Sequence, residues 1–185
     1  METLKTRNPE LAKNVRVVPI SLGEIYKLMQ KDRTKPDFLE FAYVPMQQQV
    51  TAALTILKQS DPKATQFSGV PLFVARGGPP ERGSLTIQQG NQQVIPLFFS
   101  KEELQTMLER FKQQQPNLAA SVDIQVLNLE GVLQTLKSGT SPQLNQLLLI
   151  PPRDSLEYVR SLNPGGAGQP QPPKPAPKPT PATTP

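Results

Sequence analysis

The stretch VIPLFFSKEELQTML, residues 94–108, joins an apolar strand directly to an amphipathic helix. Its first six residues are apolar, which is typical of a strand that is covered on both faces. Ser100 stands three residues before Glu103, which is the spacing of a helix capping box. Leu104 and Leu108 then follow at helical spacing and mark one buried face. The stretch therefore predicts a strand that leads into a capped helix packed on a sheet.

The flanking sequence extends this pattern into an α+β unit of order β-β-β-α-β-α-β-α. Turn residues Gly90-Asn91 separate two of the strands, and Asn128 is placed to cap a short helix. The last helix is expected to be buried through its apolar residues Leu156, Val159 and Leu162. The predicted strands are residues 70–75, 84–89, 94–99, 122–127 and 147–150, and the predicted helices start at Ser100, after Asn128 and at Pro152.

Part of this unit recurs earlier in the chain, because residues 1–29 align with residues 108–136 at a constant offset. Identical residues at this offset are Glu2 and Glu109, Lys5 and Lys112, Pro9 and Pro116, Leu11-Ala12 and Leu118-Ala119, Val15 and Val122, and Leu22 and Leu129. The similarity resumes at residues 41–45, which match the strand at 147–150 and the following proline. We interpret the chain as a tandem pseudo-symmetric repeat. Two unrelated helix–strand units of similar period are the alternative.

The first copy of this repeat is expected to be truncated at its N-terminus. Residue 1 aligns with the middle of the first long helix of the second copy, so roughly 40 structured residues and any signal peptide would precede it. The expected domains are 1–60, an incomplete first repeat; 61–162, a complete second repeat; and 163–185, a tail. The tail holds nine of the 22 prolines and is predicted to be disordered.

Composition argues against most kinds of chemistry. The chain has no His and no Cys, so the usual general base, the thiolate nucleophile and the commonest metal ligands are missing. We therefore expect no enzyme, no catalytic or metal site and no cofactor; a hydrolase based on carboxylates is the remaining catalytic alternative. The net charge of +5 is mild and the signs are mixed, which disfavours nucleic acid. No apolar run reaches the length of a membrane span.

The combination of residues 69–74, 94–104, 116–118 and 122–136 resembles a known family, and its most specific segment is Ile-Pro-Leu-Phe-Phe-Ser-Lys-Glu at 95–102. The family is that of the twenty-two-kilodalton Tic translocon subunit of chloroplasts and its cyanobacterial relatives. The late start of the first repeat and the proline-rich tail depart from what the family leads us to expect.

The resemblance implies a chaperone-like factor that binds unfolded or translocating polypeptides during protein transport or outer-membrane biogenesis. Outer-membrane translocon or assembly components are further partners that it implies. The implied location is the periplasm or thylakoid lumen, or the plastid intermembrane space in plant relatives, with the protein peripheral to the membrane at most. The alternative function is a structural or scaffold protein tethered through its basic, proline-rich tail.

Polypeptide binding of this kind would use exposed apolar surface or an open sheet edge. The candidate surface consists of apolar residues on the predicted strands and at their ends, and ordinary core packing is the other interpretation of each. These residues are Tyr43, Phe73, Phe98, Phe99 and Leu149.

Overall fold

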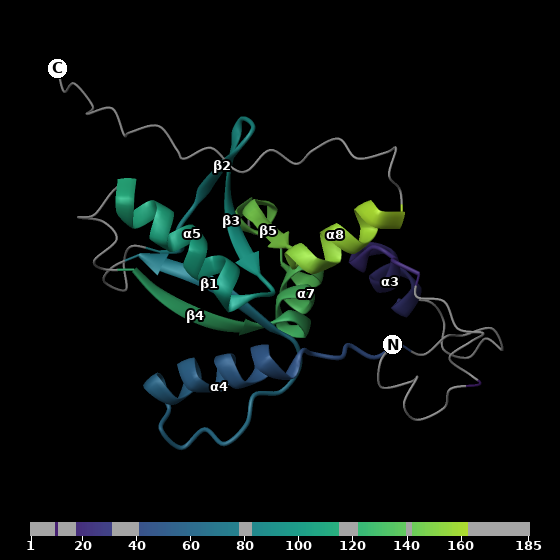
Figure 1. Ribbon diagram of the computed structural model, residues 1–185, viewed down its shortest axis with the longest axis horizontal. Helices are drawn as coiled ribbons and strands as arrows, with labels where there is room; N and C mark the ends of the chain where they lie inside the picture. Colours follow the sequence, from purple (N-terminus) through teal and green to yellow (C-terminus); the bar gives the residue numbers. More distant parts are fainter. Residues whose placement is uncertain are drawn as a thin grey trace. The chain divides into compact units, whose positions relative to one another are not determined.

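The computed structural model describes residues 10, 18–30, 41–77, 83–114, 122–139 and 142–162. The chain divides into two compact units, Met1–Ala42 and Tyr43–Pro185 (Figure 1). In the first unit, helix α3 (Leu22–Met29) starts at Ser21. The Ser21 hydroxyl accepts a hydrogen bond from the backbone N–H of Glu24, and the Glu24 carboxylate accepts one from the N–H of Ser21, which closes a capping box.

The second unit is built on a five-stranded mixed sheet, which confirms the α+β class. Its strands and α-helices follow the predicted order, apart from a first helix that this order does not contain. The elements are helix α4 (Gln47–Ser60), strands β1 (Pro71–Gly77), β2 (Ile87–Gln89) and β3 (Gln92–Phe98), helix α5 (Lys101–Gln114), strand β4 (Val122–Asn128), helix α7 (Leu129–Ser138), the 3-10 helix η2 (Pro142–Gln146), strand β5 (Leu147–Ile150) and helix α8 (Arg153–Leu162).

Strand β1 lies between β3 and β4 and is antiparallel to both, whereas β5 runs parallel to β3. The β2–β3 hairpin turns at Gly90-Asn91, as predicted, with Gly90 at a φ of +59°, a conformation that favours glycine. Pro96 lies inside β3. Strand β3 pairs with β2 up to Val94 and with β5 from Ile95 onward, and Pro96 follows this change of partner directly.

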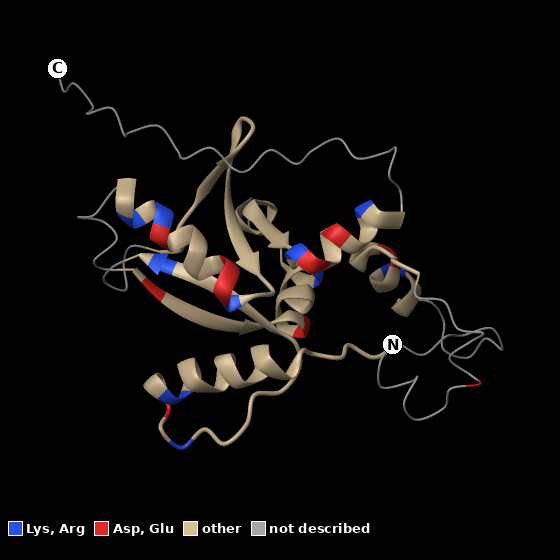
Figure 2. Ribbon diagram, viewed as in Figure 1, with Lys and Arg blue, Asp and Glu red and all other residues tan. Residues whose placement is uncertain are grey.

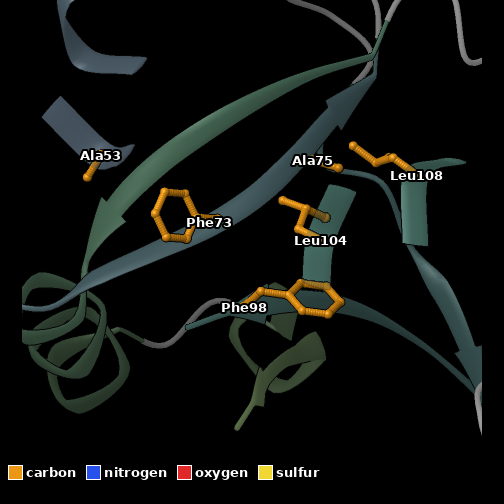
Figure 3. Packing of buried hydrophobic residues seen from close by; sticks show 6 residues of the cluster. All are labelled: Ala53, Phe73, Ala75, Phe98, Leu104 and Leu108. Carbon is orange, nitrogen blue, oxygen red and sulfur yellow. The ribbon is translucent and has the colours of Figure 1, made fainter. Parts of the chain in front are cut away.

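One face of the sheet is covered by α4 and α5. Phe73 and Phe98 are direct neighbours across β1 and β3, and they pack with Ala53 of α4 and Leu104 and Leu108 of α5 (Figure 3). Helix α5 contacts β1 and β3, whereas α4 contacts β1 and β4. The two helices therefore share this face, with α4 on the side of β4.

The opposite face holds a second buried set, because alternate residues of a strand point to opposite sides. Leu72, Val74 and Leu97 belong to this set and are buried. Helix α7 contacts β4, and η2 contacts β3. The end of α7 fits closely against η2 at Gly139, where an added Cβ would overlap the Leu144 side chain and the Thr135 carbonyl.

Two expectations about the elements are wrong. Residues 41–44, which match the strand at 147–150, form no strand. An extended segment needs a neighbouring strand to supply backbone partners, and none pairs with it in the described part of the chain. Helix α8 is not buried through its apolar face: Leu156 is half-buried, whereas Val159 and Leu162 are 40% and 47% exposed.

The division into compact units falls between Ala42 and Tyr43. The repeat boundary expected after residue 60 stays a prediction. Helix α4 lies before that boundary, yet it packs on the sheet of the second unit. The duplication itself stays a prediction. Ser21 and Asn128, which correspond at the repeat offset, both cap helices. The start of the first repeat and the tail at 163–185 lie outside the described residues.

Candidate functional site

The five predicted surface residues do not form one surface. Phe73 is 0% exposed and Phe98 is 7% exposed, and both point into the core under α4 and α5. The candidate surface must therefore be corrected at these two positions, because side chains that fill the core have no area left for a ligand. Tyr43 is half-buried and precedes α4, in a segment without regular structure.

Phe99 and Leu149 lie close to each other at the end of the sheet. The backbone N–H of Phe99 donates a hydrogen bond of 3.4 Å to the carbonyl of Ile150, which continues the pairing of β3 with β5. Leu149 stands opposite Leu97, so alternation places Leu97, Phe99 and Leu149 on one face, opposite Phe73 and Phe98. Both Phe99 and Leu149 are half-buried, so each keeps some area for a partner.

Further apolar side chains are exposed outside the predicted set. Leu127 of β4 and Leu136 of α7 are 37% and 38% exposed. On α8, Tyr158 joins Val159 and Leu162 as a side chain that is about two-fifths exposed or more. The alternation of apolar and polar residues at 122–126 is typical of a strand with one face exposed to solvent. Nothing in the sequence distinguishes the exposed apolar positions of α8 from buried ones.

A polar junction fixes α4 against the N-terminus of α5. The Glu102 carboxylate accepts hydrogen bonds from the side chains of Gln49, Gln48 and Ser100, at 2.7, 3.1 and 2.9 Å. The Gln49 side-chain oxygen in turn accepts a bond of 3.0 Å from the backbone N–H of Lys101. Nothing in the run Gln47-Gln48-Gln49 indicates that Gln49 is the buried residue.

The same junction changes the acidity of Glu102. The hydrogen bond from Gln49 is the main cause that lowers the pKa of Glu102 below its ordinary value. Partial burial acts in the opposite direction and is outweighed, with help from the bonds of Ser100 and Gln48. The carboxylate therefore stays ionised and holds the two helices together.

Only half of the predicted capping box forms at Glu103. Its backbone N–H donates to the Ser100 hydroxyl at 3.3 Å, as expected, but its carboxylate does not return a bond to the N–H of Ser100. Its carboxylate accepts a hydrogen bond of 2.8 Å from the backbone N–H of Arg153, the first residue of α8. This bond fixes the beginning of α8 against α5.

Charge is spread without a dominant sign over the second unit. Both α5 and α8 carry acidic as well as basic residues (Figure 2). Among the residues that the structure describes, no group of three or more acidic side chains could hold a metal ion. No helix within those residues is long and apolar enough to cross a bilayer.

Known proteins share both the sequence and this fold. The model of the Tic22-like family matches residues 1–160 of the chain. The chain belongs to the Tic22-like family. Its similarity to the chloroplastic TIC 22-like protein of Arabidopsis thaliana is 28% identity over 156 residues, which cover 82% of this chain and 46% of that protein. The chain spans about half the length of the curated family members that it matches.

Solved structures of Tic22 proteins have a similar fold. Anabaena Tic22, a protein-transport protein, is 38% identical, with a TM-score of 0.69 over 85% of this chain and 70% of that one. Tic22 from Plasmodium falciparum is 20% identical, with a TM-score of 0.61 over 90% of this chain and 77% of that one, and it supports the fold alone. The predicted family is therefore confirmed.

Proposed function

We propose that this chain is a non-enzymatic factor of protein transport that binds unfolded or translocating polypeptides in a chaperone-like manner. Membership of the Tic22-like family supports the process, since Anabaena Tic22 is a protein-transport protein. The polypeptide-binding activity rests on the chemistry of the second unit's surface.

The observation that carries the proposal is the set of apolar side chains that the second unit leaves exposed or half-exposed. Leu127, Leu136, Val159 and Leu162 are each more than a third exposed, and Phe99 and Leu149 add partly exposed area at the end of the sheet. Exposed apolar side chains that lie together are a feature of interaction sites. Unfolded polypeptides present the matching apolar side chains together with free backbone groups.

Suppression of aggregation tests this function. An unfolded client is diluted into buffer with and without the 185-residue chain, in the absence of nucleotide, and light scattering is followed. We expect slower aggregation at a few-fold molar excess of the chain, because binding removes apolar segments from solution. Aggregation that is unchanged at several-fold excess would contradict the proposal.

Deletion of residues 163–185 separates this function from the scaffold alternative. A polypeptide-binding surface in the second unit predicts that the shortened chain still slows aggregation. A tether predicts instead that the shortened chain loses its place in the cell while the folded part is unchanged. Aggregation suppression that disappears with the tail would move the proposed binding surface away from the second unit.

The compartment and the partners are part of the proposal. The plant relatives are chloroplastic proteins, which is consistent with the plastid intermembrane space for them. For this chain we propose an envelope compartment, the periplasm or thylakoid lumen, with translocating polypeptides and outer-membrane assembly components as partners. Fractionation of cells that express the native gene tests the location, and recovery with the cytosolic fraction would contradict it.

A further inference from the structure

Strand β4 is the terminal strand of the sheet. It pairs with β1 along its whole length, from Pro71 opposite Asn128 to Gly77 opposite Val122. No strand pairs with its other edge within the ranges that the structure describes. An open edge of this kind offers unpaired backbone N–H and C=O groups to another extended chain.

The register shows which groups face outward. The N–H of Leu129 donates to the carbonyl of Val70, and directly opposite residues in an antiparallel pair alternate between bonded and non-bonded pairs. Every second residue before Leu129 therefore directs its N–H and C=O groups to β1, and these residues are Leu127, Gln125 and Asp123. Val122, Ile124 and Val126 therefore direct their N–H and C=O groups to the outer edge.

The other side of β1 agrees with this assignment. The Ala75 carbonyl accepts a bond of 2.8 Å from the N–H of Leu85, and the Gly77 N–H donates to the carbonyl of Gly83 at 3.1 Å. Ala75 and Gly77 thus direct their backbone groups away from β4. The alternate residues of β1, Val74 and Arg76, direct their backbone groups toward β4.

Helix α4 supplies an apolar flank beside this edge. Gln48 and Gln49 reach Glu102 of α5, so the side of α4 that bears them faces α5. Val50, Leu54 and Leu57 lie on the opposite side of the helix, at 3.6 residues per turn. Helix α5 covers β1 and β3, whereas α4 covers β1 and β4. This side of α4 therefore faces away from α5, beyond the outer edge of β4. The three side chains are half-buried and keep area for a partner.

The two faces of an added strand would meet different surroundings. Side chains opposite Ile124 would point to the face of α4, where apolar residues are favoured. Side chains opposite Asp123 and Gln125 would point to the other face, where both β4 residues are exposed. A basic residue beside the Asp123 carboxylate would be favoured there, because opposite charges on neighbouring strands attract.

We propose that the outer edge of β4 takes an extended segment of a client polypeptide as an added strand. The segment has apolar side chains at alternate positions on the α4 side and a polar or basic side chain beside Asp123. This inference rests on the proposed polypeptide-binding function and assigns it to backbone pairing at one strand.

Amide hydrogen exchange of the full chain, resolved by residue, tests the pairing. The probe is the peptide Thr-Val-Lys-Val-Lys-Val-Thr with blocked ends, and its matched control is Thr-Lys-Val-Val-Val-Lys-Thr, of equal composition without alternation. At about 100 times the dissociation constant of the probe, exchange of the Val122, Ile124 and Val126 amides is expected to slow by up to about 100-fold. The Gln125 amide, already bonded to β1, should change little, and the control peptide should have a weaker effect.

N-methylated versions of the probe separate pairing from side-chain contact. Methyl groups on the amides of one alternating set block the edge that faces β4, and methyl groups on the other set leave it free. We expect one of the two versions to lose binding and the other to retain it. Equal binding of both versions, or loss of both, would overturn the pairing.

A charge reversal on the strand gives an independent readout. Asp123→Lys should weaken binding of the lysine-containing probe by about fivefold, from the loss of one cross-strand attraction. Glu109→Lys on α5 makes the same change of charge at another exposed position and should leave binding unchanged. Equal effects of the two substitutions would contradict placement of the probe beside Asp123.

The outcomes distinguish the edge from the function. If the chain slows aggregation of an unfolded client but the three amides stay unprotected when that client is bound, the edge proposal is wrong and polypeptide binding stands. If neither client nor probe binds, both proposals fail. Protection of the three alternate amides supports both.

Discussion

At the scale of single residues, Gln49 has the clearest structural role. It is buried, donates to Glu102 and accepts from the N–H of Lys101, so one side chain joins α4 to the start of α5. The role is invisible in the sequence because Gln47, Gln48 and Gln49 are chemically identical. Only the packing of α4 on the sheet decides which of the three is enclosed.

Replacement of Gln49 should therefore destabilise the second unit. We expect Gln49→Ala to lower the free energy of unfolding by about 1–3 kcal/mol, because the Lys101 N–H loses its partner and Glu102 its strongest donor. Chemical denaturation measures the loss. Gln47→Ala, at an exposed position of the same helix, is the control and should stay within about 0.5 kcal/mol of the native chain. Equal losses for the two variants would contradict the role of the junction.

The lowered pKa of Glu102 predicts a pH dependence with a definite sign. Since the pKa is lower in the folded state, the folded state binds fewer protons, and the contribution of Glu102 is present above its ordinary pKa of 4.5. It is lost as the pH falls through the folded pKa. The stability difference between the native chain and Glu102→Gln should therefore shrink on acidification from neutral pH. A difference that grows would show that the sign is wrong.

Asn128 combines two contacts at the junction of β4 and α7. Its side-chain oxygen accepts from the N–H of Gly131 at 3.2 Å, and its side-chain nitrogen donates to the carbonyl of Ser68. Asn128→Ala should cost about 0.5–2 kcal/mol, the range for loss of a helix N-cap. Thermal unfolding measures the change, with Asn145→Ala, exposed in η2, as the control. A cost no larger than that of the control would contradict the capping role.

At the scale of elements, order and type were predictable, and burial was less so. The strand at residues 94–99 and its capped helix are confirmed because hydrophobic period and caps are local properties. Whether an amphipathic face is covered depends on a partner element. The apolar positions of α8 show this: Val159 and Leu162 repeat at helical spacing, as Leu104 and Leu108 do in α5, yet only the α5 pair is buried.

The exposed face of α8 makes a prediction of its own. The double substitution Val159→Gln and Leu162→Gln should change the melting temperature much less than a substitution in the core, because both side chains are already 40% and 47% exposed. If α8 belongs to the client surface, the variant should slow aggregation less than the native chain does. Leu104→Ala, in the core, is the contrasting variant and should cost about 2–5 kcal/mol. Unchanged suppression by the double variant would remove α8 from the surface.

At the scale of the whole molecule, the repeat in the sequence and the division in space do not coincide. Helix α4 follows residues 41–45 as α8 follows residues 147–151, but α4 lies on the sheet of the second unit. Similar local sequences specify similar elements, and the partner on which an element packs is decided by whichever apolar surface is available to it. This is why the family and the element order could be predicted, whereas the unit boundary and the exposed surface could not.

A chain that binds unfolded polypeptides should discriminate them from folded ones, and a binding titration measures this discrimination. A fluorescent client that is kept unfolded by reduction and alkylation is titrated with the 185-residue chain, and anisotropy is recorded beside the same client in its folded form. We expect saturable binding of the unfolded client and at least tenfold weaker binding of the folded one, about 1.4 kcal/mol of discrimination. Equal affinity for the two forms, or no binding of the unfolded form, would contradict it.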